Sequence, residues 1–186
     1  MTVGILLLAA GESTRYRAAC GRHKLLEPIE GEPMLARSYR IARESGLPVA
    51  VVLRPEPLAL RRCIGGARQI ILPSTGIASS IAAGVKATAH WHGWLIMLAD
   101  MPWLSPATLQ QTAEALKEHQ RVRACWRGEP GHPVGFNREC YAQLVALSGE
   151  TAARELLAQH DVYLLATQDR GAVRDVDLPS MLSGEG

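Results

Sequence analysis

The stretch Val3-Gly4-Ile5-Leu6-Leu7-Leu8-Ala9-Ala10-Gly11-Glu12-Ser13 begins as an apolar run and ends in small residues. The run is typical of a buried strand. A turn of small residues directly after a strand lets backbone N–H groups approach an anion closely. Long cationic side chains that can neutralise an anion follow at once: Arg15, Arg17, Arg22, His23 and Lys24. The stretch therefore predicts a phosphate cradle in a protein that handles a nucleotide.

Apolar runs of similar length recur along the chain and alternate with amphipathic stretches. The predicted strands cover residues 3–8, 49–53, 69–72, 94–99, 122–126 and 162–166. Strands that alternate with helical segments indicate an α/β protein with a doubly wound sheet. No linker, repeat or low-complexity run divides the chain, so we expect a single domain over 1–186 with a frayed tail at 183–186.

Two helices carry clear start and stop signals. Pro33 is a first-turn residue before 34–45, and Gly46 is a stop signal after it. The pair Ser105-Pro106 predicts an N-cap and first turn before 107–119.

Composition restricts the class of protein. With 47% hydrophobic residues, the chain can bury a core without metal ions or disulfides. The net charge of +2 and the absence of basic runs interleaved with aromatics argue against nucleic-acid binding. The apolar run at the N-terminus is too short for a signal peptide or a membrane span. The cysteines form no CxxC pair, which fits a reducing, cytoplasmic compartment: Cys20, Cys63, Cys125 and Cys140.

Three loops that follow predicted strands carry chemically suggestive side chains. They cover residues 9–24, 73–80 and 100–103. In doubly wound sheets, ligands bind outside the carboxyl ends of the strands, where the strand order reverses. We therefore expect the three loops to meet at one site.

The first loop has neither the GxxxxGK[ST] pattern of a P-loop nor GxGxxG. Gly11 permits the tight turn, and Arg15 and Lys24 would bind a triphosphate. The alternative interpretation is a flexible loop that is basic without binding a ligand.

Asp100 follows an almost wholly apolar strand, a position that favours a functional carboxylate over a structural one. Mg²⁺ takes one or two carboxylates together with substrate phosphate oxygens and waters, so Asp100 is a candidate metal ligand. Capping of a turn or helix is the alternative role for this residue.

Residues 75–90 carry Ile77, Ile81 and Val85 at four-residue spacing, which predicts a helix. At its start Gly76, Ser79 and Ser80 could hydrogen-bond a base or ribose. N-capping by the hydroxyl residues explains the same pattern.

Residues 131–136 form a predicted turn into a short strand, which would expose His132 at the strand's start. A lone histidine is more often structural than catalytic.

Together these motifs resemble the MobA-like nucleotidyltransferase family and, within it, the molybdenum cofactor cytidylyltransferases. The resemblance extends over nearly the whole chain. It rests on LAAGESTR at 8–15 with Lys24, GIASSIAAGV at 76–85, LADMP at 98–102, GHPVGF at 131–136, GETAAR at 149–154 and DVDLP at 175–179. Motifs in a shared order are more specific than any one of them alone.

The resemblance implies a three-layer, Rossmann-like nucleotidyltransferase fold with a mostly parallel mixed sheet. It also implies a Mg²⁺-dependent reaction that moves CMP from CTP onto the terminal phosphate of molybdenum-loaded molybdopterin, with a client molybdoenzyme as a possible partner. Ala10 points to cytosine, because the guanylyltransferase branch of the family typically carries LAGG. The catalytic residues would be Arg15, Lys24 and Asp100, and Asp175 or Asp177 would complete the metal site.

By the same resemblance, the nucleotide-binding residues would be Leu8, Ala9, Ala10, Gly11, Ser13, Gly76, Ser79 and Ser80. Those near the acceptor would be Gly131, His132 and Pro133. The chain also departs from the family pattern. Its segment 16–20 is about four residues longer than usual, so the reach of Lys24 depends on how these extra residues fold. Gly135 replaces a bulkier apolar residue, which predicts a wider acceptor pocket.

Two other functions fit the same residues. Strand-end acids and a basic cradle also suit a nucleotidyltransferase that uses GTP or another phosphorylated acceptor. A non-catalytic carrier or insertion chaperone for the molybdenum cofactor is the alternative from a different class.

Overall fold

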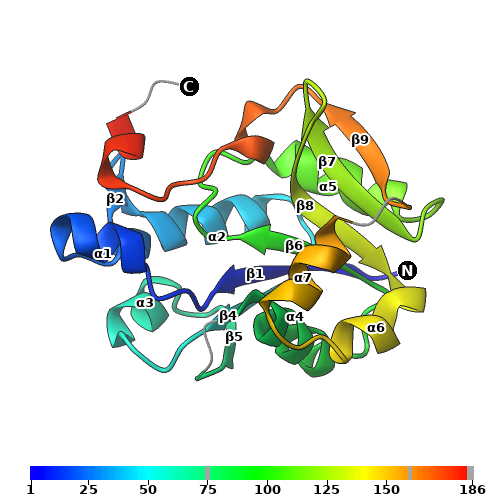
Figure 1. Ribbon diagram of the computed structural model, residues 1–186, viewed down its shortest axis with the longest axis horizontal. Helices are drawn as coiled ribbons and strands as arrows, with labels where there is room; N and C mark the ends of the chain where they lie inside the picture. The colour runs from blue at the N-terminus through cyan, green and yellow to red at the C-terminus, as the bar shows by residue number, and fades with distance from the viewer. Residues whose placement is uncertain (74–75, 159–160, 184–186) are drawn as a thin grey trace.

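The computed structural model describes residues 1–73, 76–158 and 161–183, and its centre is a twisted sheet between two layers of helices (Figure 1). The sheet has seven strands in the order β5-β4-β1-β6-β8-β7-β9. β8 pairs antiparallel with both of its neighbours, and the other pairings are parallel. The strands are β1 (Val3–Ala9), β4 (Val49–Leu53), β5 (Arg68–Ile71), β6 (Gly93–Leu98), β7 (Arg121–Trp126), β8 (Glu129–Asn137) and β9 (Tyr163–Thr167). The predicted mostly parallel, mixed α/β sheet is therefore confirmed.

The two faces of β1 explain the two helical layers. All seven residues of β1 are buried, and their side chains alternate between the faces of the sheet. Ile5 and Leu7 belong to one core cluster, and Leu6 and Leu8 belong to the other.

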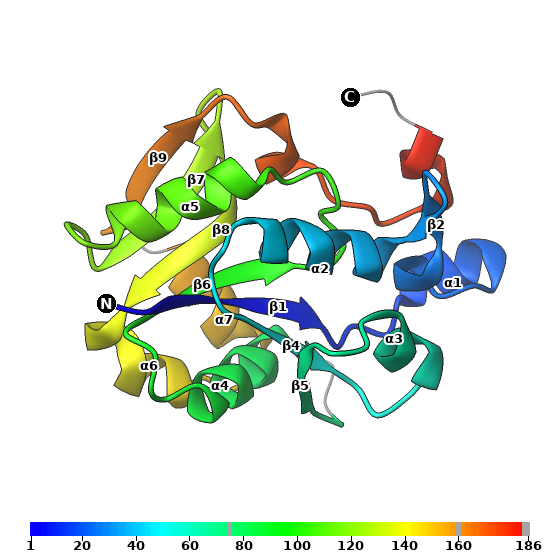
Figure 2. The ribbon, with the colours of Figure 1, turned by 180° about the vertical axis from the view of Figure 1, so that it is seen from behind.

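The first cluster lies under α2 (Met34–Glu44), α3 (Leu58–Cys63) and α5 (Pro106–Ala115), which Figure 2 shows in front of the sheet. The second lies under α4 (Ile77–Ala87), α6 (Tyr141–Val145) and α7 (Glu150–Leu157), which face the viewer in Figure 1. Short 3-10 turns complete the chain: η1 (Lys24–Leu26), η2 (Arg138–Cys140), η3 (Arg170–Val173) and η4 (Pro179–Ser183). A two-stranded hairpin joins β2 (Pro28–Ile29) to β3 (Glu32–Pro33).

The predicted helix signals agree with the structure. Pro33 precedes α2, and Gly46 follows it with a φ of +80°. The Ser105 hydroxyl oxygen caps α5 by accepting a hydrogen bond from the Ala107 N–H at 3.2 Å. α4 begins at Ile77; the predicted start at residue 75 and the predicted tail at 184–186 lie outside the described residues. Among the described residues, no helix is long and apolar enough to cross a membrane.

β8 is longer than the short strand predicted within 131–136. Two prolines, Pro130 and Pro133, and two glycines, Gly131 and Gly135, obscure the period-two pattern, because proline lacks the N–H that a ladder needs and glycine has no side chain to pack. Between the pairs Arg123–Val134 and Cys125–Pro130, β7 advances by two residues and β8 by four. Residues 131–133 therefore form a bulge, a feature that redirects side chains.

The predicted loop 9–24 was wrong in one respect, because its middle folds as α1 (Thr14–Cys20). Tyr16 is buried beneath this helix. Gly21 ends it with a φ of +75°, and its N–H donates to the Arg17 carbonyl. In this left-handed conformation glycine carries no steric penalty.

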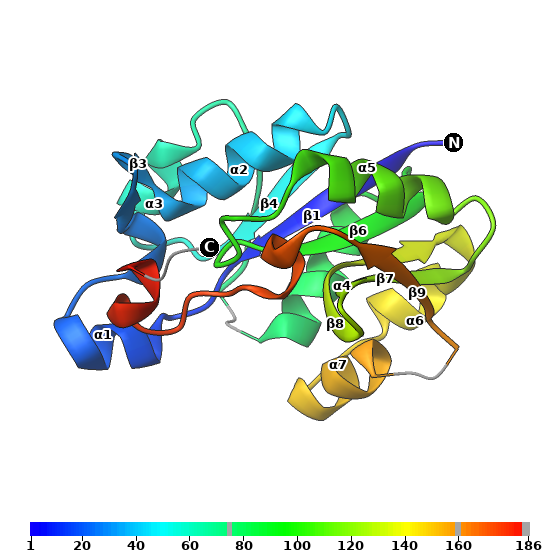
Figure 3. The ribbon, with the colours of Figure 1, turned by 90° about the horizontal axis from the view of Figure 1, so that it is seen from above.

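The C-terminal segment runs from η3 to η4 across the carboxyl ends of the strands and reaches α1 (Figure 3). Its path needs close backbone approaches. A Cβ on Gly171 would lie 2.0 Å from the Trp103 carbonyl oxygen, and a Cβ on Gly131 would lie 2.0 Å from the Ala172 carbonyl oxygen. Only glycine fits at these two positions.

Gly171→Ala should lower the free energy of unfolding by about 2–3 kcal/mol, because the added methyl group meets backbone rather than a movable side chain. Urea denaturation measures the loss. Gly65→Ala is the matched control, since its Cβ would meet its nearest backbone atom at an ordinary 3.6 Å. Equal stability of the two variants would show that the C-terminal segment can move away from Trp103.

Candidate active site

The loops that follow β1 and β6 and the first turn of α4 meet at the carboxyl edge of the sheet. They enclose a cavity of about 170 Å³. Its lining residues are Leu8, Ala9, Ala10, Gly11, Ser13, Lys24, Leu25, Ile77, Ser80, Leu98, Ala99 and Asp100. The predicted meeting of the loops at one site is thus seen in the structure.

The C-terminal segment brings two more carboxylates to this edge. The Val176 N–H donates a hydrogen bond of 2.9 Å to the backbone carbonyl of Asp100. The residues on either side of Val176 are Asp175 and Asp177, and one carboxylate oxygen from each of the three aspartates lies within 4.8 Å of the other two. The separate strand-end acid and C-terminal motif of the sequence therefore form one cluster.

The three carboxylates repel one another. Partial burial of the Asp175 carboxyl, followed by the charges of Asp100 and Asp177, raises its pKa above the ordinary value. The Asp100 Oδ1 atom is buried and has no hydrogen-bond partner among the described residues. A divalent cation with a preference for oxygen ligands fits this set, because it would offset the repulsion and coordinate the unpaired oxygen.

Lys24 lies against the same cluster. Its Nζ is 2.9 Å from Asp100 Oδ2, 3.7 Å from Asp177 Oδ1 and 3.0 Å from the Val176 carbonyl oxygen. Arg15 approaches from the exposed side, with its Nη1 3.6 Å from Asp177 Oδ2. Among the described residues, the Asp100 carboxylate thus pairs with a cation rather than capping a turn.

The longer loop still delivers Lys24 to the site, because α1 takes up the extra residues. After Gly21, the Lys24 N–H donates to the Ser13 hydroxyl oxygen at 2.8 Å. Ser13 itself has a φ of +63°. The His23 Nδ1 accepts from the Leu25 N–H at 3.2 Å. Burial and the nearby charge of Arg17 lower the pKa of His23 to about 4, so the ring is neutral near pH 7.

Two residues of α2 position the Asp100 loop, and sequence reasoning missed both. The buried Ser38 hydroxyl donates to the Ala99 carbonyl at 2.7 Å, and the Arg37 Nε donates to the Pro102 carbonyl at 2.8 Å. Neither lies in a recognisable motif. Helical spacing predicts which residues of α2 are buried but gives no information about the loop that Arg37 and Ser38 contact.

The predicted nucleotide-binding residues are divided by the structure. Leu8 to Gly11, Ser13 and Ser80 line the cavity, whereas Ser79 is half-buried and does not line it. Gly76 is the N-cap of α4 and has no side chain with which to cap this helix. The residues directly before it, 74–75, lie outside the described residues, so N-capping by hydroxyl groups stays an alternative interpretation of this motif.

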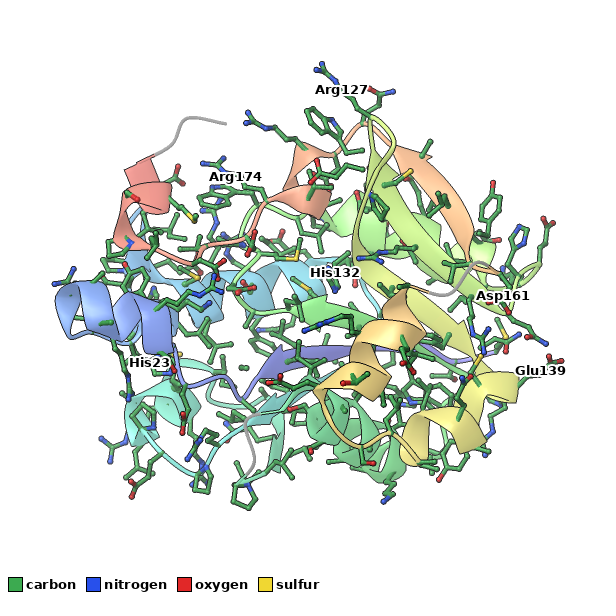
Figure 4. All side chains as sticks on the ribbon, viewed as in Figure 1. His23, Arg127, His132, Glu139, Asp161 and Arg174 are labelled. Carbon is green, nitrogen blue, oxygen red and sulfur yellow. The ribbon has the colours of Figure 1, made fainter. Side chains whose placement is uncertain are left out.

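The three predicted acceptor residues, Gly131, His132 and Pro133, lie in the bulge of β8. The expectation that His132 is exposed at the start of a strand was wrong, because the strand begins at Glu129 and the ring points inward (Figure 4). Its Nε2 atom is buried and has no hydrogen-bond partner among the described residues. Burial lowers the pKa of His132 to about 4.

His132 borders a second cavity of about 210 Å³, which shares Asp175 with the carboxylate cluster. Gly135 does not widen this cavity, contrary to expectation. A Cβ there would lie 3.0 Å from Leu95 Cδ2 and 3.2 Å from Leu116 Cδ1, so the missing side chain makes room for the core under α5.

The chain is similar in sequence to known nucleotidyltransferases. The model of the MobA-like NTP transferase domain matches residues 5–163. Bifunctional protein GlmU of Kineococcus radiotolerans is 30% identical over 181 residues, which cover 93% of this chain and 34% of that protein. The chain thus spans about a third of the length of this curated relative. Molybdenum cofactor cytidylyltransferase of Escherichia coli is 23% identical over 95% of this chain and 92% of its own.

Among solved structures, Rv0371c of Mycobacterium tuberculosis superposes with a TM-score of 0.82 at 25% identity, covering 97% of this chain and 95% of that one. A second structure of Rv0371c is described as a complex with manganese; it has a TM-score of 0.81, 24% identity, and covers 97% of this chain and 96% of that one.

Stability should fall as the pH drops from about 6.5 towards 4, because buried His23 stays neutral in the folded chain while the unfolded chain takes up the proton. The contribution of His23 is of the order of 2 kcal/mol. Urea denaturation between pH 7 and 4.5 should give a shallower fall for His23→Asn than for the wild type. The control, His90→Asn, changes an exposed histidine and should leave the pH profile unchanged. An unaltered profile in His23→Asn would refute this assignment.

Lys24→Met should tighten binding of Mn²⁺ to the nucleotide-free protein by about tenfold or more, because the ammonium now among the carboxylates repels a second cation. Titration followed by electron paramagnetic resonance measures the free Mn²⁺. Lys86→Met, which removes an exposed lysine of α4, should leave the affinity unchanged. Equal or weaker binding by Lys24→Met would mean that the metal and the lysine do not compete for these carboxylates.

Proposed function

The chain belongs to the MobA-like NTP transferase family, and from this premise we propose that it transfers CMP from CTP onto the terminal phosphate of molybdenum-loaded molybdopterin. The products are molybdopterin cytosine dinucleotide and pyrophosphate. The observation that carries the proposal is the cluster of Asp100, Asp175 and Asp177 with Lys24, at the mouth of a cavity whose wall is the small-residue loop after β1.

The reaction joins two anions. A phosphate oxygen of the acceptor attacks the α-phosphorus of CTP, the new P–O bond forms, and the bond to the bridging oxygen of the β-phosphate breaks. Pyrophosphate leaves with the electron pair of that bond. Such transfer depends on alignment and on neutralised charge, and it needs no nucleophilic side chain.

The chain supplies groups suited to both needs. Backbone N–H groups of Ala10 and Gly11 would cradle the phosphates, and Lys24 and Arg15 would neutralise the departing pyrophosphate. Ser80 would contact the ribose or base from the first turn of α4. Asp100, Asp175 and Asp177 would hold Mg²⁺. When bound, Mg²⁺ supplies positive charge to the phosphate oxygens.

Support for the substrates comes from Ala10 and from the E. coli relative. Ala10 lies in the cavity wall, in the LAAG form of the motif. The relative, a molybdenum cofactor cytidylyltransferase, matches over nearly its whole length. Gly131, His132 and Pro133 would place the acceptor beside Asp175. We further propose that the protein works in the cytoplasm, where a client molybdoenzyme receives the product.

A second candidate is transfer to a different phosphorylated acceptor. It is favoured by the bifunctional GlmU relative, which is 30% identical to this chain against 23% for the cytidylyltransferase. A shared fold and cradle do not identify an acceptor.

The test is release of pyrophosphate with CTP or GTP and Mg²⁺, with and without molybdenum-loaded molybdopterin. We expect release with CTP only when the loaded pterin is present. Release with GTP but not with CTP would show that guanine, not cytosine, is the base. Release with a sugar phosphate in place of the pterin would favour the second candidate. Tight binding of the cofactor nucleotide without any release would identify a carrier.

In the same assay Asp100→Asn should lower turnover by at least about a hundredfold, because it removes a charge from the metal cluster. Binding of the acceptor should change far less. Asp161→Asn is the control, since this exposed carboxylate pairs with Arg121 at the far edge of the sheet. Wild-type turnover in Asp100→Asn would rule out the metal role.

A further inference from the structure

A cation of β7, outside every motif of the sequence, borders the second cavity. Arg123 lies opposite the bulge of β8, and its Nε donates a hydrogen bond of 2.9 Å to the Gly131 carbonyl. The guanidinium is half-buried, and this burial lowers its pKa from the ordinary value. The bond to Gly131 fixes one edge of the guanidinium, so the group is held in the cavity wall.

The cavity of about 210 Å³ has a wall of mixed character. Its charged and polar side chains are Arg123, His132 and Asp175. The rest of the lining is apolar or backbone: Leu98, Met101, Pro130, Gly131, Ala172 and Val173. A ligand here would exchange water for an apolar wall with a few fixed polar contacts, as is typical of small-molecule sites.

His132 gives an independent indication of a ligand. Its Nε2 is a buried polar atom without a hydrogen-bond partner among the described residues, and such atoms cost free energy unless a ligand or water pairs with them. A neutral imidazole has one donor and one acceptor nitrogen. It can therefore donate one hydrogen bond to an anionic oxygen without carrying charge.

An anion that binds in this cavity needs a positively charged side chain nearby, because the carboxylate cluster lies beside it. Any anion that approaches the proposed metal site through this cavity passes Asp175, whose charge repels it. A guanidinium matches phosphate with a planar fork of N–H donors and stays charged when half-buried. Lys24 and Arg15 contact the cluster at Asp100 and Asp177, and none of these four residues lines this cavity.

We propose that Arg123, together with His132, binds the anionic group of the acceptor, a phosphate monoester, and so selects acceptors that carry one. This inference rests on the proposed function and adds to it a residue that the motifs do not contain. Arg123 is a specificity-determining residue for the acceptor, and Lys24 and Arg15 serve the nucleotide. The alternative is that Arg123 only ties β7 to the bulge through Gly131.

Steady-state pyrophosphate release tests the proposal with Arg123→Gln and Arg123→Lys. Arg123→Gln should raise the KM for the acceptor by about ten- to a hundredfold, since it removes the charge-assisted hydrogen bonds to phosphate, and leave the KM for CTP within about twofold. Arg123→Lys keeps the charge without the fork and should recover part of the affinity. Arg121→Gln, on the same face of β7, is the control and should behave as wild type.

An equal rise in both KM values, or a lower kcat with both KM values unchanged, would assign Arg123 a structural role and overturn the proposal. So would wild-type kinetics in Arg123→Gln. If Arg123→Gln does not fold, the comparison between Arg123→Lys and wild type decides, because a purely structural arginine predicts no selective change in the KM for the acceptor.

A binding measurement separates this inference from the proposed function. Titration of inorganic phosphate into the nucleotide-free protein, followed by calorimetry, should show binding that is weakened in Arg123→Gln and unchanged in the control Arg121→Gln. If that result holds while no transfer from CTP occurs, the anion site stands and the proposed function is wrong. If transfer occurs but phosphate binding does not depend on Arg123, the proposed function stands and this inference fails.

Discussion

Mutual repulsion of three carboxylates is the constraint on which the site depends. Asp100 comes from the end of β6, whereas Asp175 and Asp177 come from a segment that runs across the sheet edge. One backbone hydrogen bond, from Val176 to Asp100, fixes the two segments together. The Lys24 ammonium compensates part of the charge. The arrangement concentrates negative charge where a phosphate-transfer enzyme needs a cation, and each neighbouring element either supports the carboxylates or offsets them.

Positive charge near this cluster comes from two separate parts of the fold. Lys24 and Arg15 come from the segment after β1, and Arg123 comes from β7. β8, the antiparallel strand, lies between β6 and β7 and contributes the bulge with His132. Two anionic reactants could thus approach the cluster from different strands, each with its own cation. The mixed sheet is therefore directly relevant to the chemistry that we propose.

The sequence predicted most of the sheet, because buried parallel strands are continuous apolar runs and β1, β4 and β6 are of this kind. It also predicted the cavity loops and Asp100, whose positions follow from the rule that ligands bind at carboxyl ends of strands. α1 and β8 were less predictable. α1 replaces an expected loop, and the prolines and glycines of β8 hide its length. Ser38, Arg37 and Arg123 act through contacts between segments distant in sequence, about which a local pattern has no information.

Asp175 and Asp177 are synthesised after every strand of the sheet. The family match ends at residue 163, and the two aspartates come after it. A nascent or prematurely terminated chain that stops before Asp175 would contain every strand of the sheet and the loop after β1, yet only one of the three carboxylates. Competence for the proposed chemistry would then depend on synthesis of the segment after β9, and a chain that stops before Asp175 would keep the nucleotide cradle but lack most of the metal ligands.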